Sequence, residues 1–223
     1  MRIARFRWDE SMLYRSLARF LLLLNLPIFL TGQASHRSSF DWDSPKFHHL
    51  DYFNSHVSEA KNLSADLKPA LVRAIEAHLR PQMADLEIAN EKELRKIAEQ
   101  SRFELVDLNA DGVSEVVVQP IGLKAGCGAT GNCPFWVFAL GGGKYRLILG
   151  TSGQMYRVES HGSNGYSDIS VADHDSATEK TIYQFRFLRG QYKKIACYQA
   201  WWSTTDGRLL ERPIVNSCPG PSK

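Results

Sequence analysis

The chain has 223 residues with 27 basic and 24 acidic side chains, and its small positive balance comes from the first 34 residues. Residues 1–34 hold five Arg and two acidic residues, which leaves 22 basic and 22 acidic side chains in the remainder. A near-neutral remainder without a long basic run argues against charge-driven binding to nucleic acid or to an anionic membrane. The remaining length, about 189 residues, suits one domain with a sizeable core.

Residues 20–30, FLLLLNLPIFL, form an apolar run that is shorter than the roughly 20 residues needed to cross a bilayer. Arginines precede the run, and the small residues Gly32 and Ala34 follow it at a suitable spacing for cleavage. The pattern predicts a signal peptide over residues 1–34, removed on export to the periplasm or the extracellular space. No stable membrane span is then expected in the mature protein. The alternative is an uncleaved anchor, and Met12 is an alternative start.

The elements expected after the signal peptide begin with an arm and two helices. Residues 35–62 are polar and without a period, which indicates a loose N-terminal arm. Segments 66–79 and 90–100 carry apolar residues at helical spacing, with Asp66 and Asn90 as the expected N-caps.

From residue 103 the apolar pattern has period two, which predicts strands separated by Gly- and Asn-rich turns. Short connections favour sequential antiparallel pairing. The run PFWVFAL is apolar on both faces and predicts a central strand, whereas residues 203–223 look irregular. The sequence therefore predicts a single α+β domain over residues 63–223, with helices followed by an antiparallel β meander and an irregular C-terminal tail. The expected strands are 103–108, 113–120, 134–140, 144–150, 154–159, 166–172, 180–188 and 191–199.

All four cysteines lie after the signal peptide, and an even number in an exported chain predicts two disulfides. Of the three possible pairings, Cys127–Cys133 with Cys197–Cys218 is favoured because each pair closes its own short loop. Zinc is the alternative, but zinc sites usually have closer cysteines and histidine partners.

The stretch DLNADGVSEVVV, residues 107–118, has oxygen-bearing side chains at alternating positions followed by a glycine. Calcium prefers roughly six to eight oxygen ligands from a loop that curls around the ion. An EF-hand is excluded because Val118 stands where a glutamate is required and because both flanks are strands. The alternative is a plain hairpin, in which Asn and Asp favour turn backbone and Gly112 adopts positive φ.

This stretch resembles the strand–loop–strand calcium loop D-x-[DN]-x-D-G-x-x-[DE] of FG-GAP and integrin-type propeller repeats. It occurs once, so the resemblance implies the loop and not the propeller. It implies a structural Ca²⁺ bound by the side chains of Asp107, Asn109, Asp111 and Glu115 and by the carbonyl of Val113.

A wider resemblance covers roughly residues 64–198. The calcium-like loop is followed by CGATGNCPFWVFALGGGKYRLI, and later by GYSDI and FLRGQY. This order is similar to that of a group of small exported bacterial proteins for which no activity is established. It implies export, a local disulfide and a single domain.

Signatures of catalysis are sparse. The sequence has no P-loop and no dinucleotide fingerprint, and HGSNG (161–165) is only a near miss of the hydrolase motif G-x-S-x-G. The run DHD (173–175) is a candidate for metal ligands or for a base with its acid, but it also fits a solvated strand end. His48–His49 are weak metal candidates in a flexible arm, and His78 is expected as a partly buried histidine on an apolar helix face. A pair of carboxylates for glycoside hydrolysis is not readable from a sequence.

The run YQAWW supplies the best candidates for a binding surface, namely Tyr198, Trp201 and Trp202, although aromatic residues in a β domain also serve as core. A chain rich in stapling and poor in catalytic groups predicts an exported, non-enzymatic binding module for a protein or glycan partner, with an inhibitor-like role as one form. The alternative is a secreted hydrolase that uses distant carboxylates or His161 and His174. A structural envelope component is a third possibility.

Overall fold

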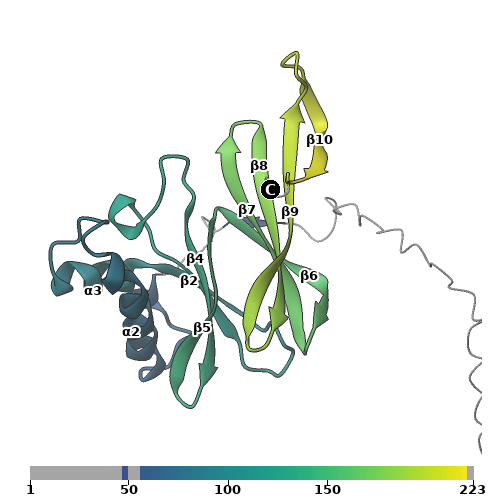
Figure 1. Cartoon of the computed structure of the whole chain (residues 1–223). Helices are drawn as coiled ribbons and strands as arrows, with labels where there is room; N and C mark the ends of the chain where they lie inside the picture. The colour runs from purple at the N-terminus through teal and green to yellow at the C-terminus, as the bar shows by residue number, and fades with distance from the viewer. Residues whose placement is uncertain (1–46, 50–55, 220–223) are drawn as a thin grey trace, which may run out of the picture. The chain divides into compact units, whose positions relative to one another are not determined.

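Two helices precede two antiparallel sheets in this computed structural model, which describes residues 47–49 and 56–219 (Figure 1). The predicted α+β class, with helices first, is confirmed. The helical elements are η2 (Val57–Glu59), α2 (Leu67–Leu79), η3 (Arg80–Gln82), α3 (Glu91–Gln100) and η4 (Leu123–Ala125). The strands are β1 (His48–His49), β2 (Arg102–Val106), β3 (Glu115–Gln119), β4 (Cys133–Gly141), β5 (Lys144–Gly153), β6 (Met155–Ser163), β7 (Tyr166–Ser176), β8 (Glu179–Leu188), β9 (Gln191–Ser203) and β10 (Leu209–Ser217).

The meander is divided between two sheets, of order β2-β3-β4-β5 and β1-β6-β7-β8-β9-β10. Within each sheet, apart from β1, consecutive strands pair as the short connections predict, but β5 and β6 lie in different sheets. The chain passes from one sheet to the other at Gly153. A Cβ there would lie 2.4 Å from Cγ1 of Val171, so only glycine allows the close approach of β5 to β7.

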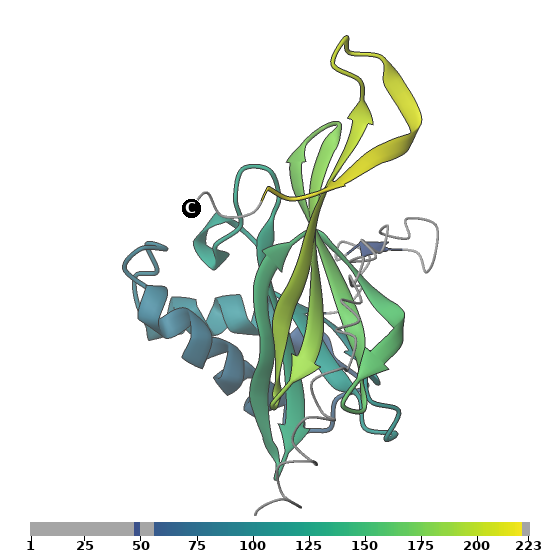
Figure 2. The ribbon, with the colours of Figure 1, turned by 45° about the vertical axis from the view of Figure 1, so that its right-hand side comes forward.

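The two sheets and the helices form layers, with the four-stranded sheet in the middle (Figure 2). Strand β4 shows why: Phe135 and Val137 pack between the sheets, whereas Trp136 and Phe138 pack under the helices. Successive strand residues point to opposite faces, so an apolar residue at every position requires cover on both sides. The predicted central position of this strand agrees with its pairing to both β3 and β5.

The helix starts differ in how they are capped. The Asn90 side chain accepts from Glu93 N–H, as predicted, and Glu93 accepts in return from Ala89 N–H. Asp66 stands before α2 but makes no capping hydrogen bond, because its backbone is already helical and its carboxylate accepts from Ser64 Oγ.

Parts of the predicted loose arm belong to the fold, which corrects that prediction for the residues described between 35 and 62. Strand β1 pairs with β6, and Phe47 packs on a cluster on the outer face of the six-stranded sheet. Val57 and Ala60 are buried under the helices. The polar composition concealed these few apolar anchors. The predicted signal peptide, residues 1–34, lies outside the described residues.

The predicted irregular tail is also corrected, because residues 209–217 form the edge strand β10. Strand β9 continues to Ser203, beyond its predicted end, and so supplies a pairing edge for β10. Cys218 N–H donates to Cys197 O beside the disulfide that joins these two residues. Figures 1 and 2 both show the β9–β10 hairpin projecting past the other strands.

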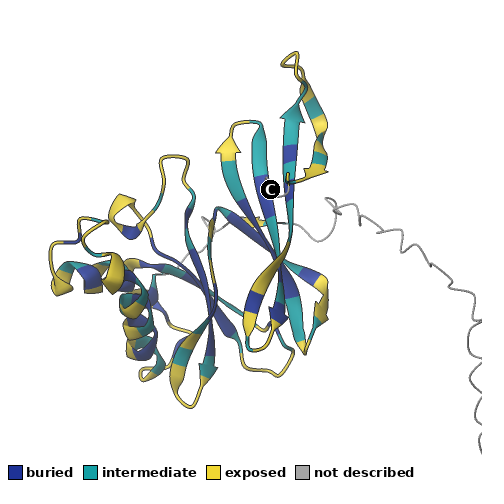
Figure 3. Cartoon of the chain, viewed as in Figure 1, coloured by how far each residue is buried: buried dark blue, intermediate teal, exposed yellow. Residues whose placement is uncertain are grey.

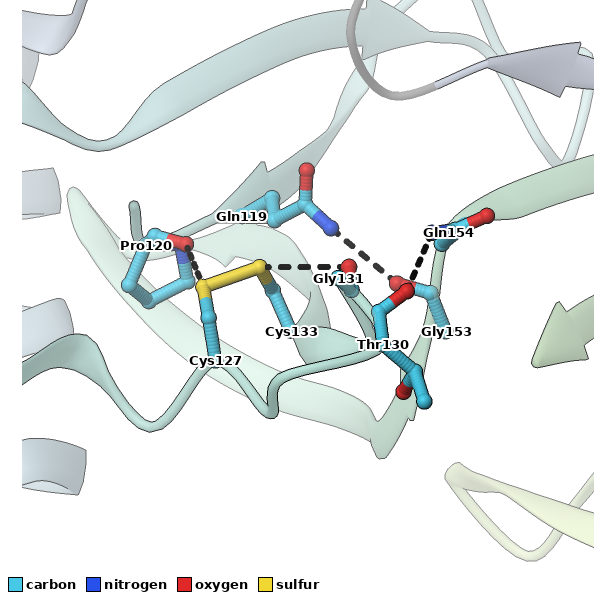
Figure 4. The surroundings of a disulfide bond; sticks show 8 residues. All are labelled: Gln119, Pro120, Cys127, Thr130, Gly131, Cys133, Gly153 and Gln154. Atoms are coloured by element: carbon cyan, nitrogen blue, oxygen red, sulfur yellow. Dashed lines mark hydrogen bonds between the residues drawn. A yellow bond between two sulfur atoms is a disulfide. The ribbon is translucent and has the colours of Figure 1, made fainter. Parts of the chain in front are cut away.

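Both disulfides are present with the favoured pairing, Cys127–Cys133 and Cys197–Cys218. The first closes the CGATGNC loop beside Gln154, whose Nε2 donates to Thr130 O at 2.8 Å (Figure 4).

The closed CGATGNC loop also pairs with the free edge of β7. Asn132 in this loop accepts from His174 N–H at 2.7 Å and donates to His174 O at 3.0 Å. The loop thus satisfies backbone groups of β7 at a point beyond the start of β6.

Candidate functional site

The predicted calcium loop joins β2 to β3 and is closed by its own hydrogen bonds. Asn109 Oδ1 accepts from Asp111 N–H at 3.1 Å, and Asp111 Oδ1 accepts from Val113 N–H at 2.7 Å. Asp107 Oδ2 accepts from Gly112 N–H at 3.0 Å, and Gly112 has a φ of 83°. These are the Asx-type bonds and the positive φ that a tight turn requires.

Glu115 lies beneath this loop and is only 3% exposed. Its Oε2 accepts from Leu108 N–H at 2.9 Å, and its Oε1 accepts from the Tyr166 hydroxyl at 3.3 Å. Burial raises the pKa of the Glu115 carboxyl above its ordinary value, and the charge of Asp111 acts in the same direction. The carboxylate therefore ties the loop to β7.

The fit of this loop to a metal ion depends on oxygens that already have partners. Within residues 47–49 and 56–219, no group of three His, Cys, Asp or Glu side chains is gathered as a metal site. Asp107, Asn109 and Asp111 share the loop, but Glu115 bonds to Leu108 and Tyr166. Calcium binding stays a prediction. The ion would have to compete with these two hydrogen bonds for the Glu115 carboxylate.

A cavity of about 350 Å³ separates the loop from the β6–β7 turn and is lined by residues 107–110 and 162–167. The two segments are joined where Ser167 N–H donates to Leu108 O at 2.7 Å. Asn164 and Gly165 both have positive φ, as expected of a two-residue hairpin turn. HGSNG is therefore the end of β6 and the turn after it, and Ser163 Oγ donates to the carbonyl of Phe187 at 3.4 Å.

The histidines of the hydrolase alternative lie far apart. His161 Nε2 is 3.7 Å from Asp168 Oδ2, whereas His174 Nδ1 is 3.2 Å from Gln154 Oε1. Asp168 and His174 are six residues apart on β7, which corresponds to about 20 Å of strand. The two histidines do not converge on one cavity.

The other titratable candidates have structural partners. Asp173 accepts from Ser152 Oγ at 3.2 Å, and burial raises the pKa of its carboxyl. Asp175 accepts from Thr181 Oγ1 at 2.7 Å. His78 lies against the rings of Trp136 and Phe138, and burial lowers its pKa. The ring of His48 lies 5.7 Å from that of Tyr156, and the side chain of His49 is outside the described part.

The three aromatic candidates of β9 do not form one surface. Tyr198 is 8% exposed and packs in the outer cluster, against which Trp202 also packs. Trp201 points to the opposite face, because successive strand residues alternate. Of the predicted surface, only Trp201 is left to contact a partner on its own face.

Trp201 is the centre of a surface built by three strands. It pairs with Glu179 on β8 and with Ile214 on β10, and its Nε1–H donates to Glu179 Oε1 at 3.0 Å. The next row has Thr181, Gln199 and Asn216. We call these six residues the Trp201 face: Glu179, Thr181, Gln199, Trp201, Ile214 and Asn216.

A cavity of about 530 Å³ opens on this face, bordered by Trp201, Ile214, Asn216 and the hairpin residues 203–205. Figure 3 shows exposed and half-buried residues at this projecting end of β8–β10, in contrast to the buried strands of the middle layer. No side-chain hydrogen bond to Gln199 or Asn216 occurs among the described residues.

Sequence reasoning missed five residues of this face: Glu179, Thr181, Gln199, Ile214 and Asn216. The contributions of β10 were lost when residues 203–223 were interpreted as irregular. The alternation of Ile214 with Asn216 was the available signal, but Pro213 and the charges before it concealed the strand.

Comparisons with known proteins gave no match to a family model, to a curated protein or to a solved structure. In the described part of the chain, no helix has both the length and the apolar character needed to cross a membrane.

Proposed function

We propose that the chain is an exported, non-enzymatic binding module that recognises a protein or glycan through the Trp201 face. The observation that supports this most directly is the indole of Trp201, held by Glu179 beside an open cavity. Aromatic side chains with a fixed polar edge are frequent anchors of binding sites. Export is supported by the two disulfides, which persist in oxidising compartments.

The hydrolase alternative would require an acid and a base that converge on one cavity. His161 and His174 lie near opposite ends of β7, so this pair gives the alternative no support. Asp173 and Asp175 each accept a hydroxyl hydrogen bond from the fold.

The test is cosedimentation of the protein with envelope and extracellular fractions of the source cells. The protein is purified from a secretory expression host, so that both disulfides can form. We expect Trp201→Ala to weaken binding by about tenfold or more, as at other aromatic anchors. Leu123→Ala is the control, because Leu123 is 77% exposed and lies outside the Trp201 face. Equal binding by Trp201→Ala and the native chain would contradict the proposal.

The proposal includes a structural calcium ion in the loop of residues 107–115. Its support is the spacing of Asp107, Asn109 and Asp111 and their place in one tight turn. Such an ion would stabilise the β2–β3 connection and would carry no chemistry.

A further inference from the structure

Trp201 and Ile214 form an apolar strip within the Trp201 face. Hydrogen bonding to Glu179 fixes the edge of the Trp201 indole, and Ile214, which is 48% exposed, stands beside the ring. An indole fixed by its N–H can still offer its ring face to a ligand. Flat ligands with an apolar face, such as a pyranose ring with its C–H groups, suit such a strip.

The rim of the same face is rich in neutral polar groups. The amides of Gln199 and Asn216 are neighbours across β9 and β10 and have no partner among the described residues. Each amide has donors and acceptors, as a sugar hydroxyl does. Thr205 adds a hydroxyl at the cavity. A ligand with many hydroxyls can therefore satisfy both amides at once.

Two carboxylates lie in or beside the face, and Arg208 and Arg212 belong to the adjoining hairpin. Glu179 lies within the face. Asp175 lies next to Thr181 and accepts a hydrogen bond from the Thr181 hydroxyl. Carboxylates only accept hydrogen bonds and repel anions, so Glu179 and Asp175 at the face favour neutral hydroxylated ligands over uronic acids or phosphates.

A protein partner fits this surface less well. Stable protein interfaces bury about 800 Å² on each side around an apolar centre, whereas the exposed aliphatic side chains here are Ile214 and, beside the cavity, Leu209. Strand addition to β10 is also disfavoured. The pairing of β10 shifts between Leu209 and Ile214, and Pro213 lacks an N–H donor, both of which are features that protect an edge.

We therefore propose that the ligand of the Trp201 face is a neutral glycan whose sugar ring stacks on Trp201 and whose hydroxyls bond to Gln199 and Asn216. This inference rests on the proposed function and gives its ligand class.

The experiment follows the indole N–H signal of Trp201 by NMR during titration with cellohexaose, maltohexaose, mannohexaose and chitohexaose. Hexagalacturonate is the anionic counterpart. We expect at least one neutral hexasaccharide to shift this signal, and Gln199→Ala to weaken its binding several-fold. Trp201→Ala should weaken binding by about tenfold or more. Trp202→Phe is the matched control, because Trp202 packs on the opposite face of the sheet.

In parallel, the cosedimenting fractions are treated with periodate, which cleaves vicinal diols, or with protease. Loss of Trp201-dependent binding after periodate and its retention after protease would support the glycan. The reverse result, with no saccharide shifting the Trp201 signal, would overturn the glycan and leave the binding module standing. Absence of any Trp201-dependent binding would overturn both proposals.

Discussion

Glu115 and Glu179 each accept a hydrogen bond from an aromatic side chain, and the two bonds serve different purposes. Glu115 accepts from the Tyr166 hydroxyl and is 3% exposed, between the β2–β3 loop and β7. Glu179 accepts from the Trp201 indole at the projecting end of β8 and β9 and is only half-buried. The first bond closes a loop onto the fold, whereas the second holds an aromatic ring on a surface that the fold leaves open.

The difference lies in what covers each region. Around Glu115, the loop amides and the Tyr166 hydroxyl already have partners inside the protein. On the Trp201 face, the amides of Gln199 and Asn216 have none among the described residues. Buried polar groups need partners for stability, and polar groups left without partners at a surface are available to a ligand.

The largest expected effect separates the two glutamates by stability. Glu115→Ala should lower the free energy of unfolding by about 3 kcal/mol, because it leaves the buried Leu108 N–H and the Tyr166 hydroxyl without their acceptor. Glu179→Ala should cost less than about 1 kcal/mol, since its partner Trp201 can bond to water. Urea denaturation measures both. Similar losses of stability in the two variants would contradict the distinction between the two glutamates. If Glu115→Ala does not fold, Glu115→Gln is the milder substitution to measure.

Calcium tests whether the loop above Glu115 has a ligand of its own. In chelator-stripped protein, calcium at about 100 times its Kd should raise the free energy of unfolding by about 2.7 kcal/mol if it binds only the folded state. Thermal melts in the presence and absence of calcium measure this gain. We expect Asp111→Ala to lose it, because Asp111 is a predicted ligand. If calcium leaves the melting temperature of the native protein unchanged, the loop is a turn held only by its own hydrogen bonds.

The sequence predicted regions where one local pattern decides the structure. Period-two alternation located the strands from β2 to β9, and the run in β4 predicted cover on both faces. Loop size favoured the correct cysteine pairing. Asn90 followed the capping rule because its extended backbone let its side chain reach Glu93 N–H.

The parts that were not predicted depend on distant contacts. Nothing local in Arg157 and Glu159 shows that their ion pair, at 2.9 Å, is buried on the outer face of the six-stranded sheet, where Phe47 lies over the guanidinium. The aromatic run YQAWW begins in the predicted strand 191–199 and continues in the longer β9. Which side of Trp201 and Trp202 would be covered depended on Phe47 and on β10, neither of which was expected to join the sheet.

The smallest expected effect is a pH dependence that comes from Glu115. Burial raises its pKa in the folded state, so the folded protein holds this proton at pH values where the unfolded chain has lost it. Its contribution to stability is therefore full below the ordinary pKa of glutamate and is lost as pH rises through the folded-state value. Urea denaturation across this range should show a free energy of unfolding that falls as pH rises, and Glu115→Gln should lack this fall.

Calcium sharpens this last test. A bound cation beside Glu115 would favour the charged carboxylate and lower its pKa, so the slope should shrink when calcium is present. Asp173→Asn is the matched variant, because burial also raises the pKa of the Asp173 carboxyl. Asp173 therefore makes its own contribution to the pH dependence, which remains in Glu115→Gln. A slope that persists unchanged in Glu115→Gln would mean that the carboxylate beneath the loop does not titrate as its burial requires. A slope that is lost in Glu115→Gln but indifferent to calcium would keep Glu115 as a structural acceptor and remove it from the predicted ligands.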